Sequence, residues 1–169
     1  MRQPCWLRSL VMSASEPRAG LVVDQPGANV ALDLFVLTER LGVLLGRALE
    51  GSGLTASQYA VYGQLLQGPR TPSEVSGVLG IPRSTLSGYL ATMQSRGDLT
   101  RERSARDGRS WQLSLTGQGR QRVRACQPAV RRAVRAVHGA LGSAADVDEV
   151  RATLGRIDAA IRAATDSDS

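Results

Sequence analysis

The stretch that decides the fold covers residues 71–116 and reads TPSEVSGVLGIPRSTLSGYLATMQSRGDLTRERSARDGRSWQLSLT. Thr71 is a favourable N-cap, Pro72 suits the first position of a helix, and Glu74 completes a capping box. Gly80 stops this helix, because glycine most readily takes the left-handed conformation that follows a helix. The apolar face of the helix is predicted to consist of Val75, Val78 and Leu79.

A second helix is predicted to follow the turn at Ile81 and Pro82 and to run from about Arg83 to Arg96, ending at Gly97. Leucine and methionine recur on one face at helical spacing. The other face carries small polar side chains, a profile that suits a helix lying in the major groove of DNA. An ordinary solvated surface accounts for this helix alone equally well. The candidates for contacts with bases and phosphates are Arg83, Ser84, Thr85 and Ser87.

A basic β-hairpin is predicted next. Residues 99–103 and 110–115 alternate between apolar and polar side chains, and the polar turn SARDG at 104–108 separates them. A two-stranded arm beside a helix-turn-helix is a wing, whose tip can place a guanidinium in the minor groove. The candidate DNA contacts of this wing are Arg101, Arg103, Arg106, Asp107 and Arg109.

The sequence around these elements resembles the multiple-antibiotic-resistance regulator (MarR) family of winged-helix transcription factors. The resemblance extends over residues 29–165. It is carried by LTASQYAVYGQLL at 54–66, the helix-turn-helix, RG at 96–97 with Arg101, RDGR at 106–109 and LSLTGQGR at 113–120. Asp107 and Arg109 match the family's wing pair, in which the acid is expected to orient a guanidinium, with Arg106 nearer the tip. The alternative is that Asp107 and Arg109 only hold the hairpin together.

The sequence departs from the family pattern in two places, and the first weakens the expected recognition of DNA bases by the second helix. Gly88 and Thr92 stand where the family often carries longer, basic side chains, so shape readout by the wing is expected to supply more of the specificity. Asp98 replaces a residue that is usually apolar, just before the first strand.

The positive charge of the chain is concentrated on this region. All 21 basic residues are arginine, and the net charge is +6. Residues 69–124 hold ten arginines and four acidic residues, whereas the remaining residues hold eleven of each. The whole excess therefore lies on the winged segment and the following turns, as expected for a protein that binds a polyanion.

Several classes of function are disfavoured by the sequence. Cys5 and Cys126 form no metal-ligand spacing, and Cys126 lies on an apolar stripe expected to be core. His138 is the single histidine, so neither a metal site nor a catalytic triad is expected. We expect no enzyme activity, no cofactor and no membrane span, and we expect a cytoplasmic protein.

The remaining chain is predicted to provide a dimerisation domain around the winged helix, in a mainly α fold. The expected parts are a disordered or loosely docked tail at 1–27, a helix at 28–53, the winged helix-turn-helix at 54–116, two helices at 117–165 and a frayed end at 166–169. Met12 is an alternative start to Met1. Apolar stripes on the long helices exceed what the winged domain needs, and the resemblance implies a twofold homodimer on a palindromic operator.

The leading hypothesis is a sequence-specific dimeric DNA-binding transcriptional regulator, a repressor that a small aromatic or phenolic effector releases. By resemblance, a ligand pocket is expected between the dimer helices and the winged domain, lined by Tyr59, Tyr62 and Trp111, although these residues also suit an ordinary core. The alternative is a winged-helix protein-interaction module that has lost specific DNA binding.

Overall fold

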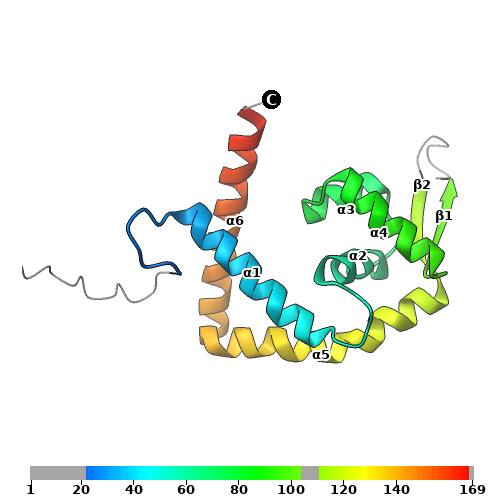
Figure 1. Ribbon diagram of the computed structural model, residues 1–169, viewed down its shortest axis with the longest axis horizontal. Helices are drawn as coiled ribbons and strands as arrows, with labels where there is room; N and C mark the ends of the chain where they lie inside the picture. The colour runs from blue at the N-terminus through cyan, green and yellow to red at the C-terminus, as the bar shows by residue number, and fades with distance from the viewer. Residues whose placement is uncertain (1–21, 104–110, 168–169) are drawn as a thin grey trace, which may run out of the picture. The chain divides into compact units, whose positions relative to one another are not determined.

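The computed structural model describes residues 22–103 and 111–167. In chain order the elements are α1 (Val30–Ala48), α2 (Ala56–Leu66), α3 (Pro72–Leu79), α4 (Arg83–Ser95), β1 (Leu99–Arg103), β2 (Trp111–Leu115), α5 (Gly117–Leu141) and α6 (Ala144–Ser167) (Figure 1). The predicted fold, a mainly α winged helix-turn-helix with long helices before and after it, is confirmed. The chain forms two compact units, whose boundary lies between Val43 and Leu44 inside α1.

The helix starts follow the capping residues of the sequence. The Thr71 hydroxyl accepts a hydrogen bond from the Glu74 N–H, and the Glu74 carboxylate accepts one from the Thr71 N–H at 2.6 Å. Thr55 and Gln58 form the same capping box at α2, and Thr116 caps α5. The predicted stop at Gly80 is confirmed, because its φ of 63° is left-handed.

The two strands of the wing are antiparallel, and Leu99 pairs with Leu115 at the base of the hairpin. Toward the tip, Arg101 stands opposite Leu113 and Arg103 opposite Trp111. The predicted second strand began at Ser110, which lies outside the described residues. Arg70, before α3, extends this small sheet, because its N–H and carbonyl both bond to Leu113, at 3.1 and 2.8 Å.

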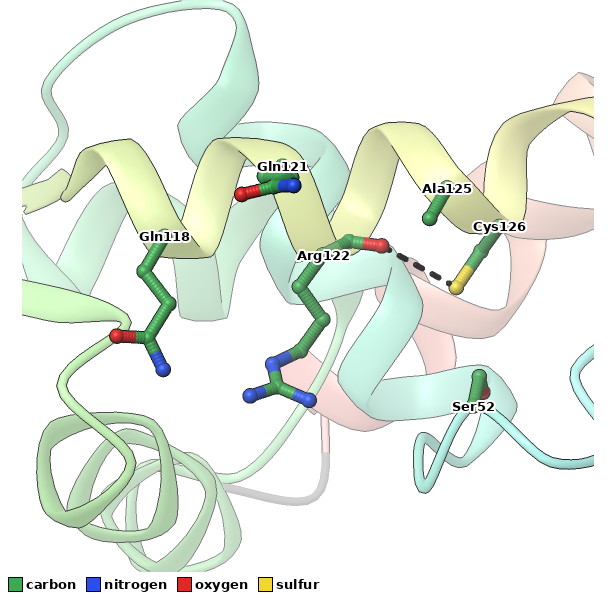
Figure 2. Close-up of a pocket in the computed structure, with 6 residues that line it drawn as sticks. All are labelled: Ser52, Gln118, Gln121, Arg122, Ala125 and Cys126. Atoms are coloured by element: carbon green, nitrogen blue, oxygen red, sulfur yellow. Dashed lines mark hydrogen bonds between the residues drawn. The ribbon is translucent and has the colours of Figure 1, made fainter.

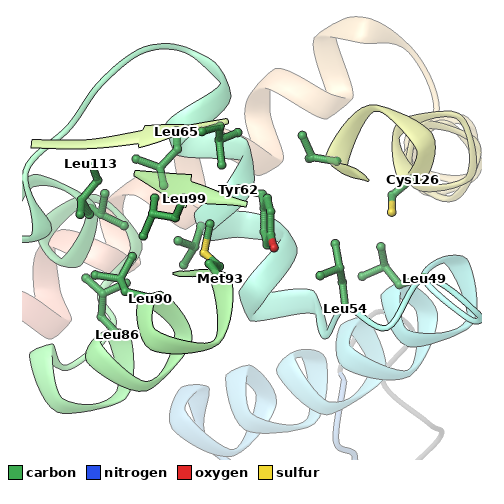
Figure 3. Close-up of a cluster of buried hydrophobic side chains, with 14 of the residues drawn as sticks. Leu49, Leu54, Tyr62, Leu65, Leu86, Leu90, Met93, Leu99, Leu113 and Cys126 are labelled. Atoms are coloured by element: carbon green, nitrogen blue, oxygen red, sulfur yellow. The ribbon is translucent and has the colours of Figure 1, made fainter. Parts of the chain in front are cut away.

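One apolar core holds the winged segment together (Figure 3). Tyr62 and Leu65 of α2 meet Leu86 and Met93 of α4 there, together with Val123 of α5 and other buried residues of α2–α5, β1 and β2. Val75 is buried as predicted, but Val78 is 56% exposed. The predicted apolar face of α3 is therefore wrong at Val78, because a two-turn helix against this core buries a narrower stripe.

The long helices carry apolar residues that the core does not cover. The stripe of α5 is buried through Cys126 and Val130, whereas Val134 and Val137 are about 40% exposed. Pro128 lies inside α5, and the helix runs to Leu141. α6 contains no buried residue and ends at Ser167, two residues later than expected. α5 also carries six arginines and no acidic residue.

Candidate nucleic-acid interface

The outer face of α4 is open and polar. Leu86, Leu90 and Met93 bury the inner face of this helix in the core. The predicted contact residues Arg83, Ser84, Thr85 and Ser87 are all exposed, and none has a side-chain hydrogen bond within residues 22–103 and 111–167. Their donors and acceptors are therefore available to a ligand.

The turn that leads into α4 is braced rather than loose. The Ser76 hydroxyl donates a hydrogen bond to the Ile81 carbonyl oxygen at 2.7 Å, which ties α3 to the turn. Pro82 occupies the N-cap position of α4 with φ of −54° and makes no side-chain cap. The start of α4 is thus fixed while its first turn of N–H groups stays free of a capping side chain.

The middle of α4 offers few groups that reach outward. Gly88 has no side chain, and the Thr92 hydroxyl donates to the Gly88 carbonyl oxygen at 3.0 Å. Since that hydroxyl is engaged with its own helix, the reaching groups of α4 are confined to its first turns.

An aromatic platform lies on the wing. The guanidinium carbons of Arg101 and Arg103 lie 5.7 and 5.5 Å from the centroid of the Trp111 ring. These distances are within the range of cation–π attraction. Trp111 is 44% exposed, although its alternation with Leu113 and Leu115 placed it on the core-facing side of β2. Near the tip that side of the wing extends past the core, and Trp111 packs under two arginines instead.

A groove of about 140 Å³ lies between α4 and the wing, beside the start of α3. Arg83 and Ser87 of α4 line it together with Arg101 of β1, so three of the predicted contact residues share one concave surface. Among the described residues, no acidic side chain lines the groove; its other lining residues are Pro72, Ser73, Leu86 and Leu90. Two guanidinium groups and two hydroxyls around a hollow are chemistry that suits a phosphate oxygen.

Ser73 is the lining residue that the sequence reasoning missed. It is exposed in the first turn of α3, and it belongs to the groove only because α3 and α4 pack together. A hydroxyl in the first turn of a helix, next to a predicted recognition helix, was the available signal. The predicted wing-tip residues Arg106, Asp107 and Arg109 lie outside the described residues.

The three aromatic residues predicted to line a ligand pocket have different surroundings. Tyr62 is fully buried, and its hydroxyl donates to an Asp98 carboxylate oxygen at 2.6 Å. Burial and this hydrogen bond raise the pKa of Tyr62 to about 12. Tyr59 packs against the core. Burial is the main cause that raises the pKa of its phenol, and the nearby Cys126 raises it further. Trp111 lies on the exposed wing, so the structure places the three aromatic residues in different surroundings, and their role in ligand binding stays a prediction.

A different pocket, of about 300 Å³, lies along α5 (Figure 2). Its polar lining comes from Ser52, Gln118, Gln121 and Arg122, and Ala125 and Cys126 complete it. Cys126 is buried, as the sequence predicted, and its thiol bonds to the Arg122 carbonyl oxygen at 3.4 Å. Amides and one guanidinium make this pocket suited to a small molecule that carries an acidic or phenolic oxygen.

Asp98, the second departure from the family pattern, is fully buried and forms an ion pair with Arg122, with Nε and Oδ2 2.7 Å apart. The sequence placed Asp98 only as an exception to an apolar position. Its partner is 24 residues away, so spacing alone gave no signal for the pair.

Among residues 22–103 and 111–167, no three side chains of His, Cys, Asp or Glu are grouped in a way that suits a metal ion. No helix in this part of the chain is both long and apolar enough to cross a membrane.

Two of three comparisons with known proteins found similar proteins. Residues 52–110 match the model of the MarR family. No curated protein sequence matches the chain. Among solved structures, the chain is similar to the M. tuberculosis transcriptional regulator MOSR in complex with DNA, at 27% identity and a TM-score of 0.67, covering 80% of this chain and 99% of that one.

Two further structures are similar over most of the chain. One is the transcriptional repressor CouR bound to a 23-mer DNA duplex, at 25% identity and a TM-score of 0.68, with 77% and 92% of the two chains covered. The other is AbsC, a MarR family transcriptional regulator from Streptomyces coelicolor, at 23% identity and a TM-score of 0.69, with 79% and 93% covered. All three proteins are described as transcriptional regulators or repressors. Residues 52–110 thus resemble the MarR family, and the chain shares the fold of these solved transcriptional regulators.

Proposed function

We propose that this protein is a dimeric, sequence-specific DNA-binding transcriptional regulator. The groove between α4 and the wing carries this proposal, because it gathers Arg83, Ser87 and Arg101, and none of its lining residues in the described part of the chain is acidic. In the proposed complex, the first turns of α4 enter the major groove, and the wing, including Arg103, Arg106, Asp107 and Arg109, follows the backbone toward the minor groove.

The distribution of charge supports a polyanionic partner. The net charge of the whole chain, +6, is also the net charge of residues 69–124. Each phosphate that an arginine neutralises releases condensed counterions, so affinity is expected to fall steeply with salt. We also propose a cytoplasmic location, because that is where a protein that binds DNA in this way would meet its partner.

Unburied apolar residues support a homodimer. Leu37 and Leu41 of α1 are 43% and 52% exposed, and Leu154 and Ile161 of α6 are 47% and 53% exposed. Single exposed apolar residues are ordinary, but rows of them at helical spacing indicate a surface that another chain covers. A twofold dimer would present two copies of α4 to successive turns of a palindromic operator, about 34–36 Å apart.

We further propose that the protein is a repressor released by a small aromatic or phenolic effector. CouR, which is named a repressor, is one of the similar proteins bound to DNA. The pocket that contains Arg122 and Gln118 is the place we assign to the effector (Figure 2). An effector acts there only if it binds better to the conformation that does not fit DNA.

The test is binding of the purified protein to the DNA upstream of its own gene, with random DNA as the control, at about 50 and 200 mM salt. We expect tighter binding to the upstream fragment and a steep loss with salt. An Arg101→Ala variant should weaken binding to both DNAs, whereas Arg156→Ala on α6 should not. Lack of binding at low salt contradicts the proposal and favours the protein-interaction alternative, which the sparse middle of α4 supports.

A matched titration tests the effector. Benzoate and phenol, added in turn to the DNA complex, should release it, and Gln121→Ala should weaken this response without changing DNA affinity. Release that is unchanged in the variant would place the effector elsewhere.

A further inference from the structure

The segment that connects α4 to the wing is bound closely to the start of α5. Its three carbonyl oxygens each accept a hydrogen bond from that helix start. Gln118 Nε2 donates to Arg96 at 3.0 Å, the Thr116 hydroxyl to Gly97 at 2.7 Å, and the Thr116 N–H to Asp98 at 3.0 Å. We call these contacts, together with the Asp98–Arg122 ion pair, the α4–α5 junction.

The carboxylate of Asp98 adds two bonds from other elements. Oδ2 accepts from the Tyr62 hydroxyl of α2 and from Nε of Arg122. Asp98 is fully buried, whereas the Arg122 side chain is 31% exposed, and Oδ1 has no partner in the described part of the chain. Burying a carboxylate this way is costly, and an apolar replacement of such a pair is often as stable. Stability alone is therefore a weak reason for an acid at this position.

The backbones of Gly119 and Asp98 are in close contact at the junction. A Cβ placed on Gly119 would overlap the Asp98 carbonyl oxygen and lie 3.0 Å from its carbonyl carbon. The Asp98 N–H is also bound, to the Met93 carbonyl oxygen in the last turn of α4, at 2.9 Å. Asp98 is thus tied through its N–H to α4, through its carbonyl to the start of α5, and through its side chain to α2 and α5.

We propose that Asp98 and Arg122 are positioning residues, which fix the angle between α4 and α5 and thereby set the spacing of the two half-sites that the dimer accepts. This inference rests on the proposed DNA-binding function. α4 carries the candidate base contacts, and α5 leads from the winged core to the exposed apolar part of the chain. A small change of angle at the junction becomes a larger displacement between two copies of α4.

The decisive variant replaces the buried polar cluster by apolar side chains: Tyr62→Phe, Asp98→Leu and Arg122→Leu together. No buried group is left unpaired, so this variant should fold. Asp98→Asn is the minimal companion, because it removes the charge and keeps the shape. Arg124→Gln is the matched control, since Arg124 is an exposed arginine on the same helix, outside the junction.

The probe is a set of duplexes with two copies of the half-site that the wild-type protein selects from a random pool, separated by about 8–13 base pairs, which brackets one helical turn. The wild type should prefer one separation by about tenfold or more. The triple variant should lose most of that preference while keeping its urea midpoint and its affinity for random DNA. Arg124→Gln should bind all duplexes more weakly with an unchanged preference. A folded triple variant with the wild-type spacing preference overturns the inference.

A second measurement does not depend on DNA. A spin label on Gln94→Cys, in a chain with Cys5→Ser and Cys126→Ser, reports the distance between the two copies of α4 in the dimer. We expect a narrow distribution that broadens in the triple variant. If the wild type selects no DNA, the proposed function fails, and the label distances still decide the inference. An unchanged width, or no measurable distance, overturns it.

Discussion

The tight packing of Gly119 on Asp98 gives a prediction whose size follows from the structure. In Gly119→Ala, the new methyl group would overlap the Asp98 carbonyl oxygen and lie 3.2 Å from its Cα. Carbon atoms normally pack at about 3.5–4.0 Å, so the two backbones must separate by several tenths of an ångström or more. Both backbones are held by hydrogen bonds, including the one from the Thr116 N–H to the Asp98 carbonyl.

The expected net loss is about 2 kcal/mol in the free energy of unfolding. Overpacking in a rigid site costs about 1–3 kcal/mol, and the rigid backbone places this site near the upper end. Alanine regains about 1 kcal/mol through its higher helix propensity. For a chain of this length, the melting temperature should fall by about 4–8 °C.

Gly117→Ala is the matched control, because Gly117 begins the same helix and has no atom within 4 Å of an added Cβ. Both variants are melted at one protein concentration, since stability of a dimer depends on concentration. The Gly117 variant should be within about 0.5 kcal/mol of the wild type. A Gly119 variant as stable as this control would refute the packing argument.

Four further outcomes are expected. Trp111→Ala should weaken binding to DNA by about three- to fivefold in a fluorescence anisotropy titration, because Arg101 and Arg103 lose the ring that holds them in place, at a combined cost to binding of about 0.6–1 kcal/mol, whereas Trp111→Phe should lose less. Gly88→Ala should raise stability by about 0.5–1 kcal/mol in urea denaturation, since its site is open. The folded-state pKa of Tyr62, about 12, lies above the ordinary value of 10.0. The contribution of its phenol to the free energy of unfolding is therefore full below pH 10 and is lost as the pH rises through 12. Tyr62→Phe should remove this pH dependence from the stability profile. Leu154→Glu should shift the protein toward monomer in sedimentation velocity, and an unchanged dimer would exclude this part of α6 from the interface.

The local structure of the winged segment was predictable from the sequence because it depends on neighbours in the chain. The capping box at Thr71, the left-handed stop at Gly80 and the first wing strand at Leu99–Arg103 were all predicted and are confirmed. These features arise from side chains within a few residues of one another.

The features that escaped prediction depend on contacts between distant segments. Asp98 finds Arg122 and Tyr62 only after α2, α4 and α5 have packed, and periodicity carries no information on such a pair. Val78 repeats at helical spacing, yet the narrow contact of a short helix leaves it exposed. Trp111 alternates with buried leucines but lies past the edge of the core.

The absence of any acid from α5 has a consequence for how the protein responds to ionic strength. Arg120 and Arg124, and likewise Arg131 and Arg135, are spaced four residues apart on one side of this helix, where like charges repel. Added salt screens this repulsion and should make the unbound protein harder to unfold, while the same salt weakens its attachment to DNA. Salt thus acts in opposite directions on the two equilibria. A loss of DNA affinity at high salt therefore reflects weaker binding and not unfolding. A melting curve in the same buffer checks this, because the unbound protein should be at least as stable there as at low salt.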